Sequence, residues 1–324
     1  MTTDSIMKRL EPVFKRVDQQ LMVNLKSEVP YISKVCEYTL LSGGKRLRPV
    51  LFILASRLCG YKGEKNYQYS IIFEYLHAAS LLHDDVIDVA DTRRGQAAAQ
   101  VVYGNQSVIL VGDFLVSRAT SLAIETELIK FIKVLSDTAA ELTEGQVLEL
   151  LHVRDVELSE SDYEGIIYRK TGALIQAACG LGAVYTGASP EYEEGLSQFG
   201  RKIGQAFQMI DDFLDYSTTA FEFGKPVGHD LDEGKITLPV ILALANAEEA
   251  DRGEMCKLIL QEARTPGEFK RFKTLLNKYH GLEQTQEKAR HLVHEAKQSL
   301  DIFPDSQEKR DLCDLADFIV SRRN

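Results

Sequence analysis

The feature that most constrains the fold is the scarcity of proline among long apolar segments: the 324-residue chain has 8 prolines, and residues 50–189 contain none. Apolar residues recur in these segments with the 3.6-residue period of amphipathic helices. Alternating strand patterns are hard to find, so we predict an all-α protein. Helices are expected at residues 4–25, 30–41, 47–59, 68–88, 95–102, 106–125, 127–150, 160–185, 191–216, 236–248, 252–264, 266–279, 282–300 and 305–321. No composition shift or low-complexity linker marks a boundary, which favours a single domain over residues 1–324.

An acidic cluster closes one of the apolar segments, where residues 81–88 read Leu-Leu-His-Asp-Asp-Val-Ile-Asp. Asp84 and Asp88 share a helix face because they are four residues apart, and Asp85 lies beside them. Carboxylates this close to one another disfavour joint ionisation. We therefore expect a cation at this end of the helix.

A second copy of the pattern closes a later apolar helix, with Asp211, Asp212 and Asp215 in the same spacing and Gln208 on the same face. Oxygen-only ligands favour Mg²⁺ over zinc or copper, and Mg²⁺ is typically held by one or two carboxylates plus substrate phosphates. Either cluster alone would be read as a solvated helix end. Two matched clusters, together with the basic segments below, indicate a diphosphate site with bound Mg²⁺.

Residues 43–49 form a basic turn that reads Gly-Gly-Lys-Arg-Leu-Arg-Pro. Gly44 allows the backbone to approach a ligand closely, and Lys45 and Arg48 offer charges that suit phosphate oxygens. The alternative reading of this segment alone is a basic surface turn. With the acidic clusters, it favours a diphosphate-binding loop.

Three further segments carry cations, and two of them directly follow an aspartate cluster in the sequence. Arg93 and Arg94 follow the first cluster and suit the outer oxygens of a phosphate. Lys170-Thr171-Gly172 interrupts a helix near its middle. Residues 218–235 form the longest irregular segment, and its glycines and lysines beside the second cluster indicate a lid that closes over a diphosphate.

The bulk composition excludes several classes. A net charge of −10 argues against nucleic-acid binding. The five cysteines show neither a zinc spacing nor a disulfide framework, which fits a reducing compartment, and we expect a cytoplasmic protein. No uninterrupted apolar run reaches 18 residues, so no transmembrane helix is predicted, and the N-terminal segment lacks a signal-peptide core.

Taken together, these motifs resemble the signatures of the trans-isoprenyl diphosphate synthases, also called polyprenyl synthetases. The resemblance rests on residues 43–49, on the first aspartate cluster followed by Arg93-Arg94-Gly95, and on Phe-Gln-x-x-Asp-Asp-x-x-Asp at 207–215. It implies a single large antiparallel helical bundle around a deep central cavity. It also implies a prenyltransferase that joins isopentenyl diphosphate to an allylic diphosphate, such as farnesyl diphosphate, by ionisation and head-to-tail condensation.

The resemblance also implies roles for individual residues and three Mg²⁺ ions per site. It assigns metal binding to Asp84, Asp85, Asp88, Asp211, Asp212, Asp215 and Asp230. It assigns binding of the allylic substrate to Arg93, Lys170, Thr171, Gln208, Lys225 and Lys235. It assigns binding of the diphosphate of isopentenyl diphosphate to Gly44, Lys45, Arg48, His77 and Arg94.

The length of the product depends on the helix that precedes Asp84. Ser80 and Ala79 lie about one turn below Asp84, and Leu76 lies about 12 Å below it at about 1.5 Å per residue. In short-chain members of the family a bulky aromatic residue near the first level acts as a floor. Because the side chains of Ser80 and Ala79 are small, a growing chain can pass them. We therefore predict a product of about C30 or longer, with octaprenyl as the central expectation.

Several alternatives remain open. A shorter-chain synthase and a catalytic subunit that requires a helper subunit both keep the same motifs. A terpene cyclase would not need residues 43–49, a non-catalytic subunit would have lost aspartates, and a phosphohydrolase built on His83 and Asp84 would need further histidine ligands. The resemblance also implies a homodimer, and a long prenyl product would allow loose membrane association. The role of Arg322-Arg323 is left open.

Overall fold

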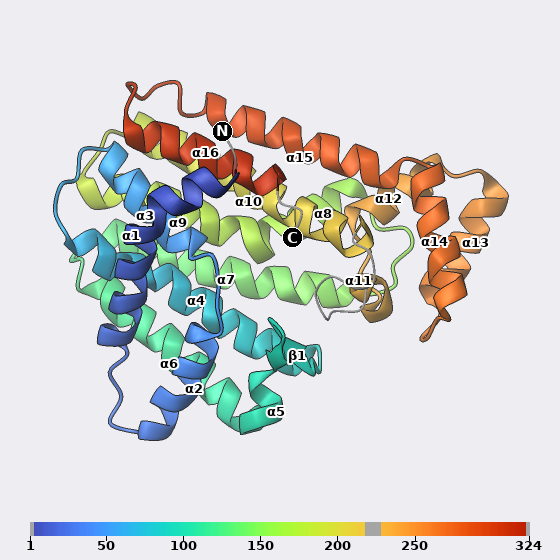
Figure 1. Cartoon of the computed structure of the whole chain (residues 1–324), viewed down its shortest axis with the longest axis horizontal. Helices are drawn as coiled ribbons and strands as arrows, with labels where there is room; N and C mark the ends of the chain where they lie inside the picture. Colours follow the sequence, from blue (N-terminus) through green and yellow to red (C-terminus); the bar gives the residue numbers. More distant parts are fainter. Residues whose placement is uncertain (1–2, 218–227, 322–324) are drawn as a thin grey trace. The chain divides into compact units, whose positions relative to one another are not determined.

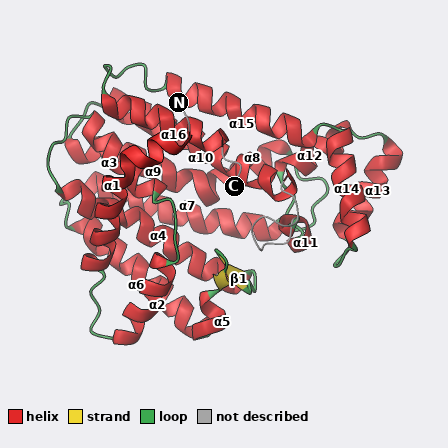
Figure 2. Cartoon of the chain, viewed as in Figure 1, coloured by secondary structure: helices red, strands yellow, loops and turns green. Residues whose placement is uncertain are grey.

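The structure is a computed structural model that describes residues 3–217 and 228–321 (Figure 1). Helices make up almost all of the regular secondary structure of the described residues, as Figure 2 shows, and the all-α prediction is confirmed. The described strands are two short ones, β1 (Thr92–Arg93) and β2 (Gln96–Ala97), which pair antiparallel with Thr92 opposite Ala97.

The helices follow one another along the chain with short connections. The first seven are α1 (Thr3–Asn24), α2 (Pro30–Leu41), α3 (Leu47–Leu58), α4 (Lys65–Ile87), α5 (Ala99–Tyr103), α6 (Asn105–Ile124) and α7 (Ile129–Leu151). Then come α8 (Glu160–Ile167), a π-helical turn η1 (Tyr168–Gly172), α9 (Ala173–Thr186), α10 (Pro190–Ser217) and α11 (His229–Glu233). The last five are α12 (Leu238–Asn246), α13 (Glu249–Leu260), α14 (Pro266–Lys278), α15 (Gly281–Gln298) and α16 (Gln307–Ser321).

The chain divides into two compact units. Unit 1 comprises Met1–Ala140, Leu174–Gly200 and Ser299–Leu315. Unit 2 comprises Glu141–Ala173, Arg201–Gln298 and Ala316–Asn324. The single domain expected over residues 1–324 stays a prediction.

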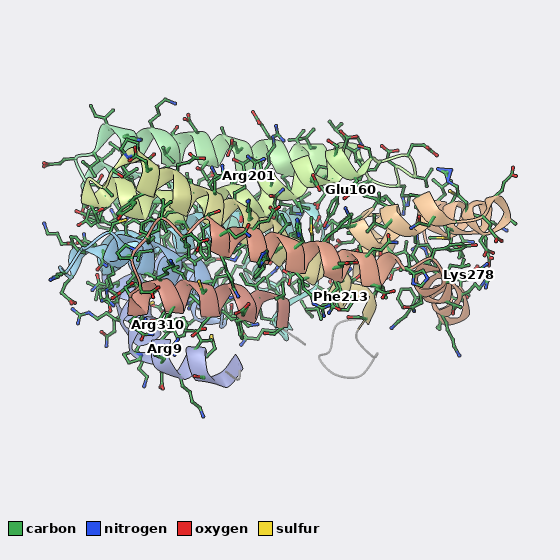
Figure 3. All side chains as sticks on the ribbon, turned by 90° about the horizontal axis from the view of Figure 1, so that it is seen from above. Arg9, Glu160, Arg201, Phe213, Lys278 and Arg310 are labelled. Atoms are coloured by element: carbon green, nitrogen blue, oxygen red, sulfur yellow. The ribbon has the colours of Figure 1, made fainter. Side chains whose placement is uncertain are left out.

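The core of unit 1 is built around α4, which packs along α6 and also against α3 and α1. Phe52 of α3, Phe73 of α4 and Phe131 of α7 are fully buried together, with ring centroids 5.3 to 6.5 Å apart. Aromatic rings of this size bury more apolar surface than any other side chains. In the same unit, the half-buried Arg9 of α1, labelled in Figure 3, pairs with the buried Asp311 at 2.6 Å.

Unit 2 has its own core around α12, which packs against α15, α14 and α8. Gly281 at the start of α15 allows a close approach, because a Cβ there would lie 2.2 Å from the Pro239 carbonyl oxygen. α14 begins with a capping box in which Thr265 and Glu268 satisfy each other's backbone N–H groups. Pro266 at the first helical position suits such a start.

The structure corrects several expected boundaries. The helix expected over 95–102 begins only at Ala99, because Arg94 and Gly95 both have positive φ (51° and 75°) and close the β1–β2 hairpin. Two successive residues with positive φ are what a two-residue hairpin turn requires. The segment expected to be irregular over 218–235 contains α11, and residues 218–227 lie outside the described chain. The helix expected over 252–264 is α13, which ends at Leu260 because Gln261 is extended.

α6 is the one helix among the described residues with the length and hydropathy of a membrane span. It carries Asp113 and Arg118, and α4 packs along one of its faces. Buried helices of soluble proteins pass the same test of length and composition, so this property by itself assigns no membrane span.

Candidate active site

The first aspartate cluster lies in the last turn of α4, in unit 1. The helix ends in a Schellman motif, in which the N–H of Ala90 donates to the carbonyl of Asp85 at 3.0 Å. Val89 takes the left-handed position of this motif, with φ 51°, where glycine is usual and a β-branched residue is strained. Acidic side chains at a helix C-terminus face the negative end of its dipole. A bound divalent cation would relieve the repulsion on Asp84 and Asp88.

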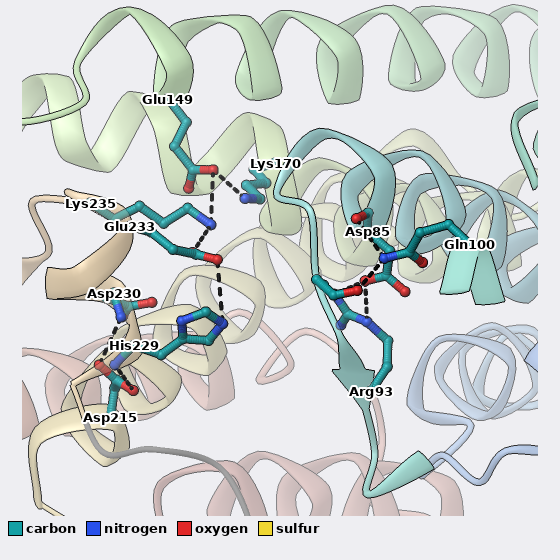
Figure 4. A network of polar contacts seen from close by, with 11 residues as sticks. Asp85, Arg93, Gln100, Glu149, Lys170, Asp215, His229, Asp230, Glu233 and Lys235 are labelled. Carbon is teal, nitrogen blue, oxygen red and sulfur yellow. Dashed lines mark hydrogen bonds and ion pairs between the residues drawn. The ribbon is translucent and has the colours of Figure 1, made fainter. Parts of the chain in front are cut away.

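Two side chains hold this end of α4 in place (Figure 4). Nε of Arg93 donates to Oδ1 of the buried Asp85 at 2.5 Å. Nε2 of Gln100 donates to the main-chain carbonyls of Asp85, at 2.9 Å, and Ala90. Gln100 therefore gives the Asp85 carbonyl a second donor beside the N–H of Ala90, and it ties the residues that follow α4 to α5. No pattern in the sequence pointed to Gln100.

The predicted diphosphate loop at residues 43–49 adopts the conformation that its glycines allow. Gly43 and Gly44 have φ of 97° and 142°. Arg94 donates to the carbonyl of Gly43, and its guanidinium would lie 3.2 Å from a Cβ at Gly44. The structure thus brings Gly44 and Arg94 together, as the sequence predicted for one substrate diphosphate.

The middle cation of this loop, Arg46, has a structural role. Its side chain is 6% exposed and pairs with Glu74 at 2.7 Å and Asp18 at 2.8 Å. Two carboxylates compensate the buried charge, which would otherwise be costly. Arg46 therefore anchors the loop to α1 and α4.

His77 of α4 lies among the predicted substrate cations. Burial, followed by the positive charges of Arg48 and Arg94, holds the pKa of His77 well below its usual range. The imidazole is therefore neutral at pH 7. A neutral ring can donate one hydrogen bond to a phosphate oxygen without adding a charge.

In unit 2, the second cluster is built into a chain of hydrogen bonds. The buried Asp212 accepts from the Tyr163 hydroxyl at 2.6 Å and from Nε2 of Gln208 at 2.9 Å. The Thr171 hydroxyl donates to Oε1 of Gln208 at 2.8 Å. Burial raises the pKa of Asp212 to about 7, although its two donors act against that shift. Two predicted residues, Thr171 and Gln208, are thus joined to the second aspartate cluster.

Asp215 fixes the start of α11. Its carboxylate accepts from the backbone N–H groups of His229 at 3.2 Å and Asp230 at 3.1 Å (Figure 4). Burial, and then the neighbouring charges of Asp215 and Asp212, raise the pKa of Asp230 well above its usual range. Asp212, Asp215 and Asp230 therefore interact electrostatically, and their role in binding a cation stays a prediction.

Two predicted lysines converge on one glutamate of α7. Nζ of Lys170 bonds to Oε2 of Glu149, and Nζ of Lys235 lies 3.9 Å from the same oxygen and 2.6 Å from Glu233 (Figure 4). These lysines lie together as predicted for a diphosphate grip, with carboxylates in contact with them. The sequence reading missed Glu149, because a glutamate on a helix face is indistinguishable from a solvated one.

The turn that carries Lys170 and Thr171 is π-helical, and such turns often occur at functional sites. Gly145 of α7 packs directly against it, because a Cβ there would lie 2.6 Å from the backbone nitrogen of Lys170. Tyr168 of the same turn also contacts α10, where the Arg201 guanidinium lies 4.5 Å from the centre of the Tyr168 ring.

Gly145→Ala is expected to lower the free energy of unfolding by about 1–3 kcal/mol, since the new methyl group overpacks the π turn. It is also expected to lower the rate of prenyl transfer by displacing Lys170. Gly253→Ala in α13 is the matched control, because nothing lies within 4 Å of its Cβ position, and it should stabilise by up to about 1 kcal/mol. Urea unfolding and turnover of both variants test this; equal effects at the two sites would contradict it.

The remaining predicted residues have varied positions. Leu76 and Ala79 are buried in α4, and Ser80 donates to the carbonyl of His77 at 2.9 Å. The ring of His83 faces the Ile109 carbonyl of α6 at 3.1 Å, which does not favour the phosphohydrolase reading. Lys225 and Arg322-Arg323 lie outside the described residues.

Metal binding stays a prediction. Within residues 3–217 and 228–321, no group of three or more His, Cys, Asp and Glu side chains is arranged so that it could hold a metal ion. All the carboxylates of the two clusters offer oxygen ligands, and Mg²⁺ in such sites takes further ligands from substrate phosphates and water. The donor set therefore fits Mg²⁺.

Comparisons with known proteins agree with this arrangement of motifs. Residues 29–276 match the polyprenyl synthetase family. An octaprenyl diphosphate synthase of Haemophilus influenzae is 35% identical over 322 residues, which cover 99% of this chain and 98% of that protein.

Solved structures give the same result. A decaprenyl diphosphate synthase of Rhodobacter capsulatus superposes with a TM-score of 0.93 at 34% identity, covering 100% of both chains. A polyprenyl synthase of Caulobacter crescentus, described as complexed with calcium and isoprenyl diphosphate, has a TM-score of 0.93 at 35% identity, covering 100% of this chain and 98% of that one. The chain therefore belongs to the polyprenyl synthetase family.

Proposed function

We propose that this protein is a long-chain trans-polyprenyl diphosphate synthase, which adds isopentenyl diphosphate units to an allylic diphosphate. The observation that carries the proposal is that each unit with an aspartate cluster also holds cations: Arg93 pairs with Asp85 in unit 1, and in unit 2 Lys170 and Lys235 lie at Glu149, where the charge of Lys235 also acts on Asp230. Such cations suit the oxygens of a bound diphosphate. The octaprenyl and decaprenyl products named for the relatives support the long-chain reading.

Mg²⁺ is the metal that the donor set suits; Asp84 and Asp88 would hold two ions and Asp211 a third. Asp212, Asp215 and Asp230 would help through water. Bound Mg²⁺ supplies Lewis-acid stabilisation of the departing diphosphate. The calcium in the complex of the Caulobacter polyprenyl synthase supports a divalent-metal site in the family.

The side chains of this chain then serve two tasks. Arg93, Lys170 and Lys235 balance the charge that develops on the allylic diphosphate as its C–O bond breaks. The oxygens of Thr171 and Gln208 stabilise the allylic cation, which is held away from the bulk water that would quench it. The double bond of isopentenyl diphosphate attacks that cation, and the released diphosphate takes the proton that is lost.

The second substrate is assigned to the loop at 43–49 and its neighbours. Lys45, Arg48 and Arg94 offer positive charge, and the neutral His77 offers a hydrogen bond. This set holds isopentenyl diphosphate without a metal. A terpene cyclase does not need a binding site for isopentenyl diphosphate, so the presence of these residues favours chain elongation.

We further propose a homodimer formed through α5 and α6. Val101, Val102, Ile109, Leu110 and Ile124 are apolar yet 42–67% exposed. A second copy that covers these residues would remove their side chains from water. Light scattering of the purified protein should give twice the 36.4 kDa of one chain; a monomer at micromolar concentration would contradict the dimer.

The five cysteines are unbridged, which supports the proposed cytoplasmic location. Loose membrane association would come from the long prenyl product. A requirement for a helper subunit is the competing proposal, because such a catalytic subunit carries the same motifs.

Removal of divalent metal is expected to abolish prenyl transfer. Purified protein with Mg²⁺, farnesyl diphosphate and labelled isopentenyl diphosphate should give a ladder of prenyl products that ends at about C40, and a chelator should suppress it. The physical reason is the loss of charge compensation for the leaving diphosphate. Sizing the dephosphorylated products is the measurement, and excess Mg²⁺ after chelation is the control. A stop at C15–C20 would favour the short-chain alternative, whereas folded but inactive protein would favour a helper subunit.

A further inference from the structure

The hydrogen bonds around Asp212 form a directed chain that begins outside the predicted substrate residues. Tyr163 belongs to α8, whose start is fixed by Ser159, which accepts from the N–H of Asp162. The Tyr163 side chain is 3% exposed and its hydroxyl donates to Oδ2 of Asp212. The opposite oxygen of Asp212 accepts from Gln208, whose own oxygen accepts from Thr171. Every hydrogen in the chain therefore points toward Asp212.

This direction fixes which atoms the far end presents. In its ionised form the Asp212 carboxylate can only accept hydrogen bonds, so the amide of Gln208 then turns its NH₂ group toward Asp212 and its oxygen toward Thr171. The hydroxyl of Thr171 then donates its single hydrogen to the oxygen of Gln208. The lone pairs of the Thr171 oxygen are left for whatever lies beyond it, and lone pairs suit a cation.

We propose that Tyr163 is a positioning residue that holds Asp212 as a double acceptor and thereby makes the Thr171–Gln208 end of the chain present oxygen lone pairs to the allylic cation. The inference rests on the proposed function, because it needs an allylic cation beside Thr171. It adds a residue that contacts neither substrate nor metal and acts through three hydrogen bonds.

The direction of the chain can be reversed by one substitution. In Asp212→Asn, the side chain has one oxygen and one NH₂ group. The Tyr163 hydroxyl, buried and in need of an acceptor, takes the oxygen. The NH₂ group then faces Gln208 and turns its amide around, so that Thr171 accepts from Gln208 and directs its own hydrogen outward, toward the cation.

Tyr163→Phe therefore has opposite consequences in the two backgrounds. With Asp212 present, it removes the donor that holds the carboxylate and weakens the chain. In the Asp212→Asn background, it removes the group that forces the reversed orientation, and the original direction becomes accessible again. A residue with a merely structural role would weaken both proteins.

Four proteins test this: the parent, Tyr163→Phe, Asp212→Asn and the double variant. The probe is an allylic diphosphate analogue with a tertiary ammonium group at the position of the cation, compared with its uncharged carbon isostere by calorimetry with Mg²⁺ at pH 8. The ratio of the affinity for the ammonium analogue to the affinity for the carbon isostere should fall about tenfold in each single variant. This ratio should be about threefold higher in the double variant than in Asp212→Asn. Thermal unfolding of all four reports whether they are folded.

A preference that stays the same in Tyr163→Phe, or that falls further in the double variant, would overturn the inference. The product assay on the parent judges the proposed function separately. A parent protein that binds neither analogue would overturn both.

Discussion

Asp84→Asn is expected to lower kcat/KM for chain elongation by about a thousandfold, because metal-assisted charge stabilisation contributes several kcal/mol. Asp84 lies in the last turn of α4, where the helix dipole already disfavours acidic groups. Asparagine keeps the size of the side chain and removes the charge that would hold Mg²⁺. Steady-state incorporation of labelled isopentenyl diphosphate at saturating Mg²⁺ measures the loss.

Asp91→Asn is the matched control for this prediction. Asp91 is an exposed acid three residues beyond the cluster, and its substitution should change kcat/KM by less than about twofold. The Asp84 variant should also be more stable without metal than the parent, since one repelling charge is gone. Full activity of Asp84→Asn would refute the metal assignment on α4.

Ala79→Tyr is expected to shorten the main product from about C40 to about C15–C20, because the phenol ring would stand about one helical turn below Asp84. Ala79 is 2% exposed on α4. If a growing chain passes this level, the tyrosine side chain will occupy the space that the chain needs. The measurement is the size distribution of dephosphorylated products with farnesyl diphosphate as starter.

The control is Ala79→Ser, a small side chain that should keep the parent product length. Thermal unfolding separates a blocked path from a damaged core, because overpacking of a closed core would cost about 1–3 kcal/mol. Parent-length products from a folded Ala79→Tyr variant would show that the chain does not run along this face of α4.

Residues whose role follows from local spacing were predictable from the sequence. The aspartates of the two clusters and the glycine–cation loop at 43–49 are recognisable by their spacing, and the long helices follow from apolar periodicity. The structure then groups Asp215 with Asp230, and Thr171 with Gln208, as predicted.

Residues that act through tertiary contacts were not predictable. Glu149 and Gln100 look like ordinary helix residues until folding brings Lys170 to one and the end of α4 to the other. Tyr163 looks like one more buried aromatic residue. In the sequence, Gly145 is a residue of low helix propensity inside a helix. Only the π turn packed against it explains why this position has no side chain. The β1–β2 hairpin was missed although Arg94-Gly95 is a usable turn signal, because the surrounding pattern favoured a helix.

The π turn at residues 168–172 has a consequence for the evolution and redesign of this protein. A π turn holds one more residue than an α-helix uses over the same stretch. Deleting one residue from it would let α8 and α9 join as one continuous α-helix and rotate the side chains on one side by about 100° relative to those on the other. The one additional residue of the π turn therefore sets whether Lys170 and Thr171 can face the same substrate as Gln208. Its deletion would change the direction of these two side chains without altering any residue of the aspartate clusters.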